Sequence, residues 1–280
     1  MLSGDLSTLL AGRYVEIRVH PLTYPEFLEF HGLEDSDDSL MIYLNYGGLP
    51  GLRQIGLDSD EHVWAYLSSV FNTIMLKDII ERHDIRNVTF LNNLIAFYAD
   101  TTGKLTSANS ISKYMKSQGE NISSNLVLLY RSFYQEAYLL NAVSRYDIHG
   151  KRILESNEKI YWDDLGLRNL KAEGGMDSYI EKVIENAVYK HLCFLGYKVQ
   201  VGVLGAGEVD FVCTKPGETA YVQATYLMGE QATRDREFGP LEKIRDNHPK
   251  YVISVTPFLT SRDENGIKHI SLREFLNKGL

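Results

Sequence analysis

The sequence has 280 residues, of which 44% are hydrophobic and 24% are charged, and its net charge is −8. This length allows two or three small domains, and the composition excludes a disordered chain. Because no run reaches the roughly 20 apolar residues that span a bilayer and the N-terminus lacks a secretory signal, we expect a cytoplasmic protein without a membrane partner.

The first third of the chain is expected to be mainly helical. Alternating apolar residues from Tyr14 to Val19 predict a strand, and two prolines then lead into a short helix. A long helix is expected from Ser59 or Asp60. Another helix, "VTFLNNLIAFYADTTG", ends at Gly103, because glycine adopts the left-handed conformation of a helix end with little strain. We divide this part into residues 1–35 and a helical region, 36–103.

Residues 104–172 have the element order of a winged helix-turn-helix. Two helical runs, "SANSISKYMKSQG" and "ISSNLVLLYRSFYQEAYLL", are separated by a turn at Gly119. A β-hairpin with its turn at His149-Gly150 follows them. The same two-helix unit is also common where no DNA is bound, so a protein-docking role is an equal alternative.

This middle region is also the part of the chain with a positive net charge. Residues 104–152 contain seven basic and three acidic side chains, whereas residues 1–103 contain six basic and fifteen acidic ones. Phosphate binding needs a local basic face, although a solvated charged surface gives the same composition. Candidate DNA contacts are Lys113 and Lys116 on the first helix, Ser124, Asn125 and Arg131 on the second, and Lys151 and Arg152 on the wing.

Residues 173–280 alternate between helical and strand patterns and predict an α/β domain. The helix "SYIEKVIENAVYKHLCFLG" precedes three strand patterns, then a helix, "RDREFGPLEKIRDN", a further strand and a last helix. The expected fold class is therefore mixed α and α/β, with a helical and winged-helix middle followed by a restriction-endonuclease-like α/β domain.

Four polar residues in this last part resemble the site of the PD-(D/E)XK nucleases. Glu185 borders the apolar face of the first helix, Asp210 lies within a strand, and Gln223 and Thr225 lie two apart on the next strand. In those nucleases, carboxylates hold a divalent metal against the scissile phosphate and a lysine assists the attacking water. Glu185 and Asp210 are therefore the candidate ligands of Mg²⁺.

The pattern departs from these nucleases at two positions. Gln223 stands where the second metal-binding acid is expected, and Thr225 stands where the lysine is expected. Side chains that could substitute for the lost groups are Glu208, Lys198, Arg234 and Arg236. The alternative is that the four residues form a satisfied polar network without catalysis.

Taken together, the motifs resemble the C-terminal two-thirds of a prokaryotic AAA-type ATPase family that ends in a nuclease-like domain of unknown function. The resemblance rests on "MLSGDLSTLLAGRYVEIRVHPLTYPEFLEF", "YLSSVFNTIMLKDIIERHDIRN", "SISKYMKSQG", "KIYWDDLGLRN" and "GEVDFV" with "YVQATY". It implies that residues 1–35 are the end of an ATPase domain, that the parent family uses ATP and Mg²⁺, and that Arg13 senses phosphate.

No P-loop pattern occurs in the sequence, so ATP hydrolysis by this chain alone is not expected and no cofactor is assigned to it. The leading hypothesis is a non-catalytic C-terminal region of an AAA-type ATPase that binds DNA or a partner through a degenerate nuclease-like domain. The alternatives are a metal-dependent DNA endonuclease and a protein-interaction module, which includes self-association.

Overall fold

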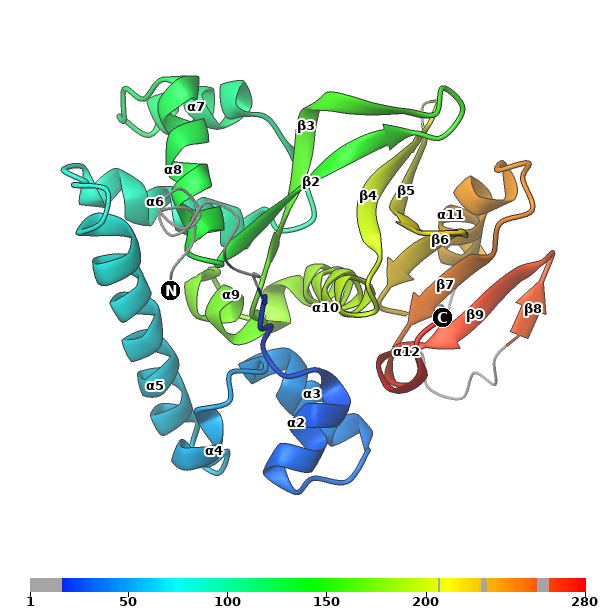
Figure 1. The fold of residues 1–280 in the computed structure, drawn as a ribbon, viewed down its shortest axis with the longest axis horizontal. Coiled ribbons are helices and arrows are strands. Elements are labelled where there is room, and N and C mark those ends of the chain that lie inside the picture. Colours follow the sequence, from blue (N-terminus) through cyan, green and yellow to red (C-terminus); the bar gives the residue numbers. More distant parts are fainter. Residues whose placement is uncertain (1–16, 206, 228–230, 256–261) are drawn as a thin grey trace.

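The computed structural model describes residues 17–205, 207–227, 231–255 and 262–280. These residues form a mixed α/β structure in which one sheet runs from the hairpin region to the C-terminal domain (Figure 1). Its strand order is β1-β3-β2-β4-β5-β6-β7-β9-β8. The strands are β1 (Leu105–Thr106), β2 (Leu140–Asp147), β3 (Arg152–Trp162), β4 (Lys198–Leu204), β5 (Gly207–Lys215), β6 (Glu218–Thr225), β7 (Lys250–Ser254), β8 (Arg262–Glu264) and β9 (Ile267–Ser271).

The N-terminal half of the described chain is helical, as expected. Ser59 caps α5, and Gly103 has a φ of +71° after α6. The helices are α2 (Tyr24–His31), α3 (Asp37–Tyr46), α4 (Leu52–Ile55), α5 (Asp60–Thr73), the π-helix η1 (Ile74–Ile80) and α6 (Val88–Asp100). The prediction of a strand over residues 14–19 is wrong for residues 17–19, the part that the structure describes. Ile17 and Val19 are 81% and 86% exposed and pair with no strand.

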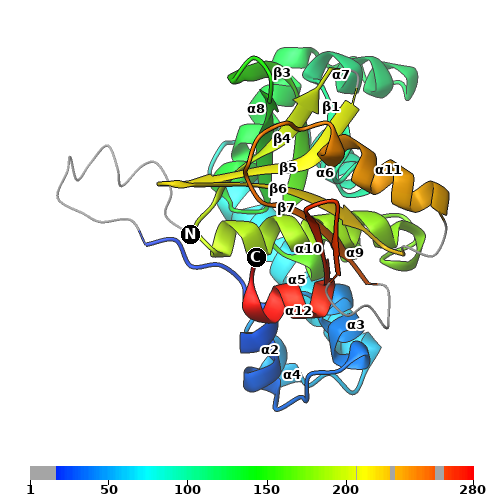
Figure 2. The same cartoon turned by 90° about the vertical axis from the view of Figure 1, so that its right-hand side faces the viewer.

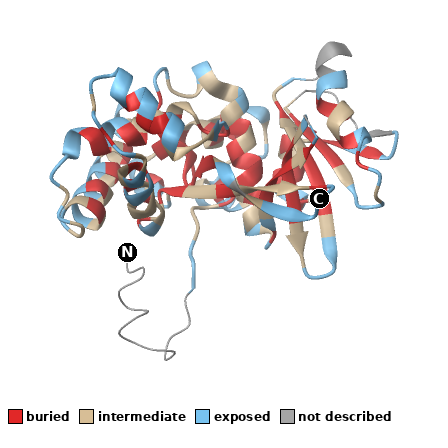
Figure 3. Ribbon diagram, turned by 90° about the horizontal axis from the view of Figure 1, so that it is seen from above, coloured by how far each residue is buried: buried red, intermediate tan, exposed pale blue. Residues whose placement is uncertain are grey.

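In the middle region, α7 (Ala108–Ser117) and α8 (Ser124–Glu136) precede the β2–β3 hairpin, and Ser123 caps α8. The expected turn at His149-Gly150 is confirmed, since residues 148–151 join the two strands. β1 pairs with β3 in the antiparallel direction. Buried side chains of the helices from α5 to α8, of the helix over residues 165–171 and of one face of this hairpin form the first core. Figure 3 shows the buried residues of the chain in red.

The sheet continues across the expected domain boundary at residues 172 and 173. β2 pairs in parallel with β4 through Arg145 and Val201, so the hairpin is joined to the C-terminal strands by backbone hydrogen bonds. The connection between them contains α9 (Leu165–Lys171), the 3₁₀ helix η2 (Asp177–Tyr179) and α10 (Ile180–Phe194). The division into domains stays a prediction.

Two helical layers cover the C-terminal part of the sheet (Figure 2). α10 and α12 (Leu272–Lys278) pack on one face, and α11 (Gln231–Glu242) packs on the other. The expected α/β alternation is therefore present, with the additional antiparallel pair β8–β9 that the sequence patterns did not indicate. No helix in the described residues has the length and apolar character required to cross a membrane.

Candidate functional site

A buried lysine lies among three carboxylates: the two of the nuclease-like pattern, Glu185 and Asp210, and that of Glu208, which was expected to substitute for a lost group. The Lys159 Nζ is 2.8 Å from Glu185 Oε1, 2.7 Å from Glu208 Oε1 and 3.3 Å from Asp210 Oδ1. The Lys159 side chain is only 4% exposed, whereas the Glu208 side chain is 35% exposed and faces solvent in part. We call Lys159, Glu185, Glu208 and Asp210 the acid–lysine cluster. It satisfies a buried cation with charge-assisted hydrogen bonds.

Local structure explains why these side chains converge. Glu208 and Asp210 are two residues apart on β5 and therefore lie on the same face of the strand. Glu185 lies on α10, and the next residue, Asn186, fixes this helix to β3. The Asn186 side chain accepts a hydrogen bond from the Trp162 N–H (2.7 Å) and donates one to the Trp162 carbonyl (2.9 Å). This contact aligns α10 with the strand that carries Lys159.

A second set of polar contacts surrounds Asp210. Its Oδ2 accepts a hydrogen bond from the Ala224 N–H (3.0 Å), and its own N–H donates to Gln223 Oε1 (3.1 Å). Glu237 of α11, which is buried, interacts with the Gln223 side chain and with the Asp210 charge. Gln223 therefore joins the neighbouring strands and α11, a role that an amide performs with its donor and acceptor.

The electrostatics hold the lysine in its charged form. Burial alone lowers the pKa of Lys159, but the nearby carboxylates of Glu185, Asp210 and Glu208 outweigh burial and raise it well above its ordinary value. Burial raises the pKa of Glu185 to about 7, although Lys159 opposes this shift. The Tyr161 hydroxyl donates to the same Glu185 oxygen at 2.6 Å. The Lys159 ammonium thus offsets part of the negative charge of three acids, of which Glu185 and Asp210 are largely buried and Glu208 is partly exposed.

This arrangement does not fit a bound Mg²⁺. The Lys159 ammonium occupies the point on which the carboxylate oxygens converge, which is where a divalent cation needs them. Among the described residues, no group of three or more His, Cys, Asp or Glu side chains is arranged to hold a metal ion. Glu185 and Asp210, the predicted metal ligands, are brought together, but a lysine joins them.

The other predicted site residues are placed less centrally. Thr225 is buried at the end of β6, where it pairs with Ser254 of β7. Among the residues proposed to compensate, Lys198 is exposed on β4 and Arg236 pairs with Glu237 at 2.8 Å. The side chain of Arg234 lies outside the described part of the structure.

Some of the candidate DNA-contacting side chains are exposed, and others are buried in part or paired with acidic side chains. Lys113, Lys116, Asn125 and Lys151 are exposed, and Arg152 is 73% exposed, with its Nε 3.6 Å from an Asp147 carboxylate oxygen. Arg131 instead pairs with Glu158 at 2.5 Å. Ser124 is half-buried in the first turn of α8, and Arg13 lies outside the described residues.

The outer face of α8 is partly apolar. Leu128 and Leu129 are 42% and 48% exposed, and Arg131 on the same helix is committed to Glu158. Base reading from α8 therefore has little support in the described side chains, whereas phosphate contacts by the exposed lysines remain available.

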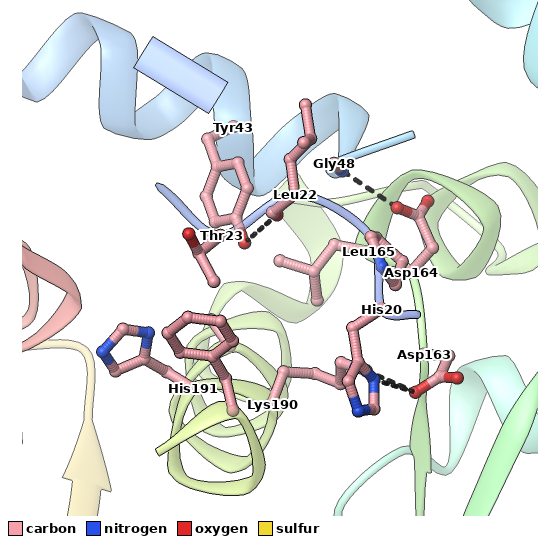
Figure 4. A pocket seen from close by; sticks show the side chains of 14 residues that line it. His20, Leu22, Thr23, Tyr43, Gly48, Asp163, Asp164, Leu165, Lys190 and His191 are labelled. Atoms are coloured by element: carbon pink, nitrogen blue, oxygen red, sulfur yellow. Dashed lines mark hydrogen bonds and ion pairs between the residues drawn. The ribbon is translucent and has the colours of Figure 1, made fainter. Parts of the chain in front are cut away.

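A separate small pocket lies where the N-terminal segment meets α10 (Figure 4). His20, Asp163 and Lys190 line its polar side, and the Lys190 ammonium pairs with an Asp163 carboxylate oxygen. Arg18 also pairs with Asp163, at 3.1 Å. The cavity has a volume of about 30 Å³, which is room for about two water molecules. The ion pairs of Asp163 with Arg18 and Lys190 therefore hold the N-terminal segment against α10. The pocket offers no room for a substrate-sized ligand.

Asp164, beside this pocket, fixes two loops. Its carboxylate caps α9 by accepting from the Leu167 N–H (3.0 Å) and accepts from the Gly48 N–H (2.9 Å). A Cβ atom on Gly47 would lie 2.5 Å from this carboxylate, and Gly47 has a φ of +76°, so glycine is required there. Burial raises the pKa of Asp164 to about 6, while the backbone donors lower it.

Sequence reasoning missed Lys159, Tyr161 and Glu237. Lys159 interrupts an apolar strand pattern in "KIYW", and a lysine among residues expected to be buried is a signal for a buried ionic partner. Its partners lie 26 to 51 residues farther along the chain, so the signal does not identify them.

Residues 37–177 match the family described as "Domain of unknown function (DUF8612)". Because this match covers half of the chain, the chain belongs to that family. It is 34% identical over 258 residues to an uncharacterized protein of Haemophilus influenzae, an alignment that covers 91% of this chain and 63% of the relative. It is 26% identical over 261 residues to uncharacterized protein MJ1544 of Methanocaldococcus jannaschii, covering 87% and 56%.

The chain thus spans about three-fifths of the length of the curated relatives that it matches. No solved structure matches it.

Proposed function

We propose that this chain is a non-catalytic, DNA-binding region of a larger protein. The observation that carries the non-catalytic part is the Lys159 ammonium within 3.3 Å of Glu185, Glu208 and Asp210. A divalent cation would have to displace a buried ammonium whose pKa is raised by the same carboxylates. In this proposal the nuclease-like site serves as a polar core of the α/β part.

The proposed DNA-binding element is a winged helix-turn-helix formed by α6, β1, α7, α8 and the β2–β3 hairpin. Support comes from the element order, from the strand order β1-β3-β2 and from exposed cations on α7 and the wing. Because Arg131 is paired and α8 presents leucines, we assign the contacts to phosphates rather than to bases. The proposed residues are Lys113, Lys116, Asn125, Lys151 and Arg152.

The test is a titration of labelled duplex and single-stranded DNA with the purified full chain at two salt concentrations, with Mg²⁺ or Mn²⁺ present. We expect binding that weakens steeply with salt, and intact DNA. Absence of binding at low salt contradicts the DNA-binding part and favours a protein partner or self-association. Metal-dependent cleavage contradicts the non-catalytic part.

A second candidate is a metal-dependent endonuclease in which Lys159 replaces the lysine missing at Thr225. The observation that favours it is that Lys159 of β3 lies beside Asp210. This candidate requires cleavage that is lost in both Asp210→Asn and Lys159→Met while the variants stay folded.

The relationship to AAA-type ATPases is also a proposal. The aligned region leaves 37% or more of each relative outside it, which is room for a nucleotide-binding domain in those proteins. We expect the full-length Haemophilus influenzae relative to bind ATP with Mg²⁺, which calorimetry measures directly. Failure of that protein to bind nucleotide removes the ATPase relationship and leaves the DNA-binding proposal unaffected.

A further inference from the structure

A long helix of the N-terminal half lies along an outer edge of the molecule (Figure 1). It consists of α5 and the π-helix η1, which follow one another without a break over residues 60–80. Its buried side chains, among them Val63, Leu67 and Phe71, pack into the first core. At 1.5 Å per residue the helix is about 30 Å long, so its opposite face presents an extended surface to solvent.

This outer face contains an open hollow with a volume of about 590 Å³. The residues that line it all belong to this one helix and are Ala65, Ser68, Ser69, Asn72, Thr73, Leu76 and Lys77. Most of these side chains are small, and small side chains let a second helix approach the backbone closely. Leu76 is 48% exposed, and a helix packed into the hollow would remove this apolar side chain from water.

Two polar side chains of the hollow already have hydrogen-bond partners within the helix. The Thr73 hydroxyl donates to the Ser69 carbonyl (2.8 Å), and the Asn72 side-chain amide donates to Ser68 Oγ (3.5 Å). Burying a polar group costs much less free energy when the group keeps its hydrogen bond. Covering this face therefore leaves both donors satisfied.

The charges on this face are placed symmetrically about Ser69. Glu61 lies eight residues before Ser69 and Lys77 lies eight residues after it, and both side chains are exposed. Glu61 also precedes Ala65 by four residues, so it extends the row of side chains that lines the hollow. Two copies of the helix packed antiparallel about Ser69 therefore place Glu61 of each copy at the level of Lys77 of the other. A parallel pair places like charges together, which is unfavourable.

We infer that the outer face of α5 and η1 is the interface of a homodimer in which the helices of two copies pack antiparallel about a two-fold axis at Ser69. Interfaces between identical patches are the commonest form of self-association. Because one helix limits the contact, we expect it to bury less than the roughly 800 Å² per partner of a standard interface and to dimerise at micromolar concentrations. The face is separate from α7 and the β2–β3 hairpin (Figure 1), so this inference does not depend on DNA binding.

Sedimentation equilibrium of the full chain over a micromolar concentration series tests the dimer. We expect a monomer–dimer equilibrium for the wild type. Ser69→Arg places a bulky cation of each copy at the axis and should weaken dimerisation at least about tenfold. Asn277→Arg, at an exposed position of α12, is the matched control and should behave as the wild type. Circular dichroism verifies that both variants are folded.

Two results of this experiment contradict the inference. One is a wild type that stays monomeric over the whole concentration series. The other is a dimer that the folded Ser69→Arg variant forms as strongly as the wild type, because the interface then lies on another surface.

A charge exchange tests the antiparallel arrangement. Glu61→Lys and Lys77→Glu should each weaken dimerisation about fivefold, because each replaces two attractive pairs by two repulsive ones. The double variant Glu61→Lys/Lys77→Glu should restore the wild-type affinity. Within one chain the two positions are about 24 Å apart along the helix, beyond the Debye length of about 8 Å at physiological salt, so restoration requires contact between copies. A double variant that dimerises more weakly than either single variant contradicts the antiparallel pairing.

Cross-linking tests the position of the axis. Ser69→Cys should form a disulfide-linked dimer under mild oxidation, because a two-fold axis at this residue brings its two copies within the roughly 4.4–6.8 Å between Cα atoms that a disulfide spans. The controls are Asn277→Cys and the wild type, in which Cys193 is half-buried and Cys213 is buried. Absence of the linked dimer at concentrations where the wild type is dimeric would overturn the placement of Ser69 at the axis.

Discussion

The Lys159 ammonium on β3 lies 3.3 Å from the Asp210 carboxylate on β5, although β2 and β4 separate these two strands in the sheet order. The register shifts between Val143 and Arg145 and between Gln200 and Gly202. Such irregularities bend strands and increase their twist. The curved sheet therefore brings the hairpin back over the start of β5, and Lys159 connects the two halves of the molecule through charge.

Replacing Lys159 with methionine should destabilise the fold strongly. The substitution keeps the length of the side chain but leaves three buried or half-buried carboxylates without their cation, and breaking a buried ion pair costs about 3–5 kcal/mol. Urea unfolding of the variant measures this loss. Lys198→Met, at the exposed first residue of β4, is the matched control, and equal stability of the two variants would show that the cluster does not stabilise the fold.

Asp164 and Glu185, two acids with raised pKa values, should each contribute stability that falls as the pH rises from about 4 to 7, against an opposing contribution from His191, whose pKa burial lowers to about 4. Asp164 has a folded-state pKa of about 6 and Glu185 of about 7, against about 4 when unfolded. A raised folded-state pKa contributes stability that is complete below the unfolded value and is lost as the pH passes the folded value.

Relative to the wild type, Asp164→Asn should remove the contribution that falls up to about pH 6, and Glu185→Gln should remove the contribution that falls up to about pH 7. Asparagine retains the capping oxygen for α9, so Asp164→Asn tests the charge rather than the cap. Thermal unfolding at each half pH unit measures the slopes. A wild-type curve that rises steadily from pH 4 to 7, unchanged in both variants, contradicts the assigned titrations.

Asn186→Ala should weaken the attachment of α10 to β3. Asn186 satisfies both the N–H and the carbonyl of Trp162 in the core, and a buried backbone group without a partner costs about 1–3 kcal/mol. We expect a loss of about 2–4 kcal/mol in the free energy of unfolding, with faster hydrogen exchange at Trp162. The exposed Asn277→Ala is the control, and equal exchange at Trp162 in both variants would show that this contact is dispensable.

Exposed and paired cations should differ in their effect on DNA binding. Lys113→Ala and Lys116→Ala should each lower the slope of log K against log salt by about 1, because each removes a proposed phosphate contact. Arg131→Ala should leave the slope unchanged, since its guanidinium is held by Glu158. Fluorescence anisotropy with a labelled duplex across a salt series distinguishes these cases, and a slope reduced by Arg131→Ala alone would reverse the assignment.

Several local features follow from the sequence alone. Ser59 and Ser123 mark the starts of α5 and α8, because a serine side chain accepts from the free N–H groups of a helix start. The β2–β3 hairpin and the α/β alternation follow from periodicity in the same way. The sequence also indicated that Glu185, Asp210 and Gln223 belong together, because their places on a helix and two strands match a known pattern.

Only the tertiary structure decided what these residues do to one another. Lys159 reaches the acids across 26 to 51 residues, and Arg131 is withdrawn from the surface by Glu158 across 27 residues. Local periodicity predicts which face of a helix or strand a side chain occupies, but not which residues from distant parts of the chain pack against that face. Those residues decide the charge balance of a buried site, because burial and neighbouring charges set the pKa of each group.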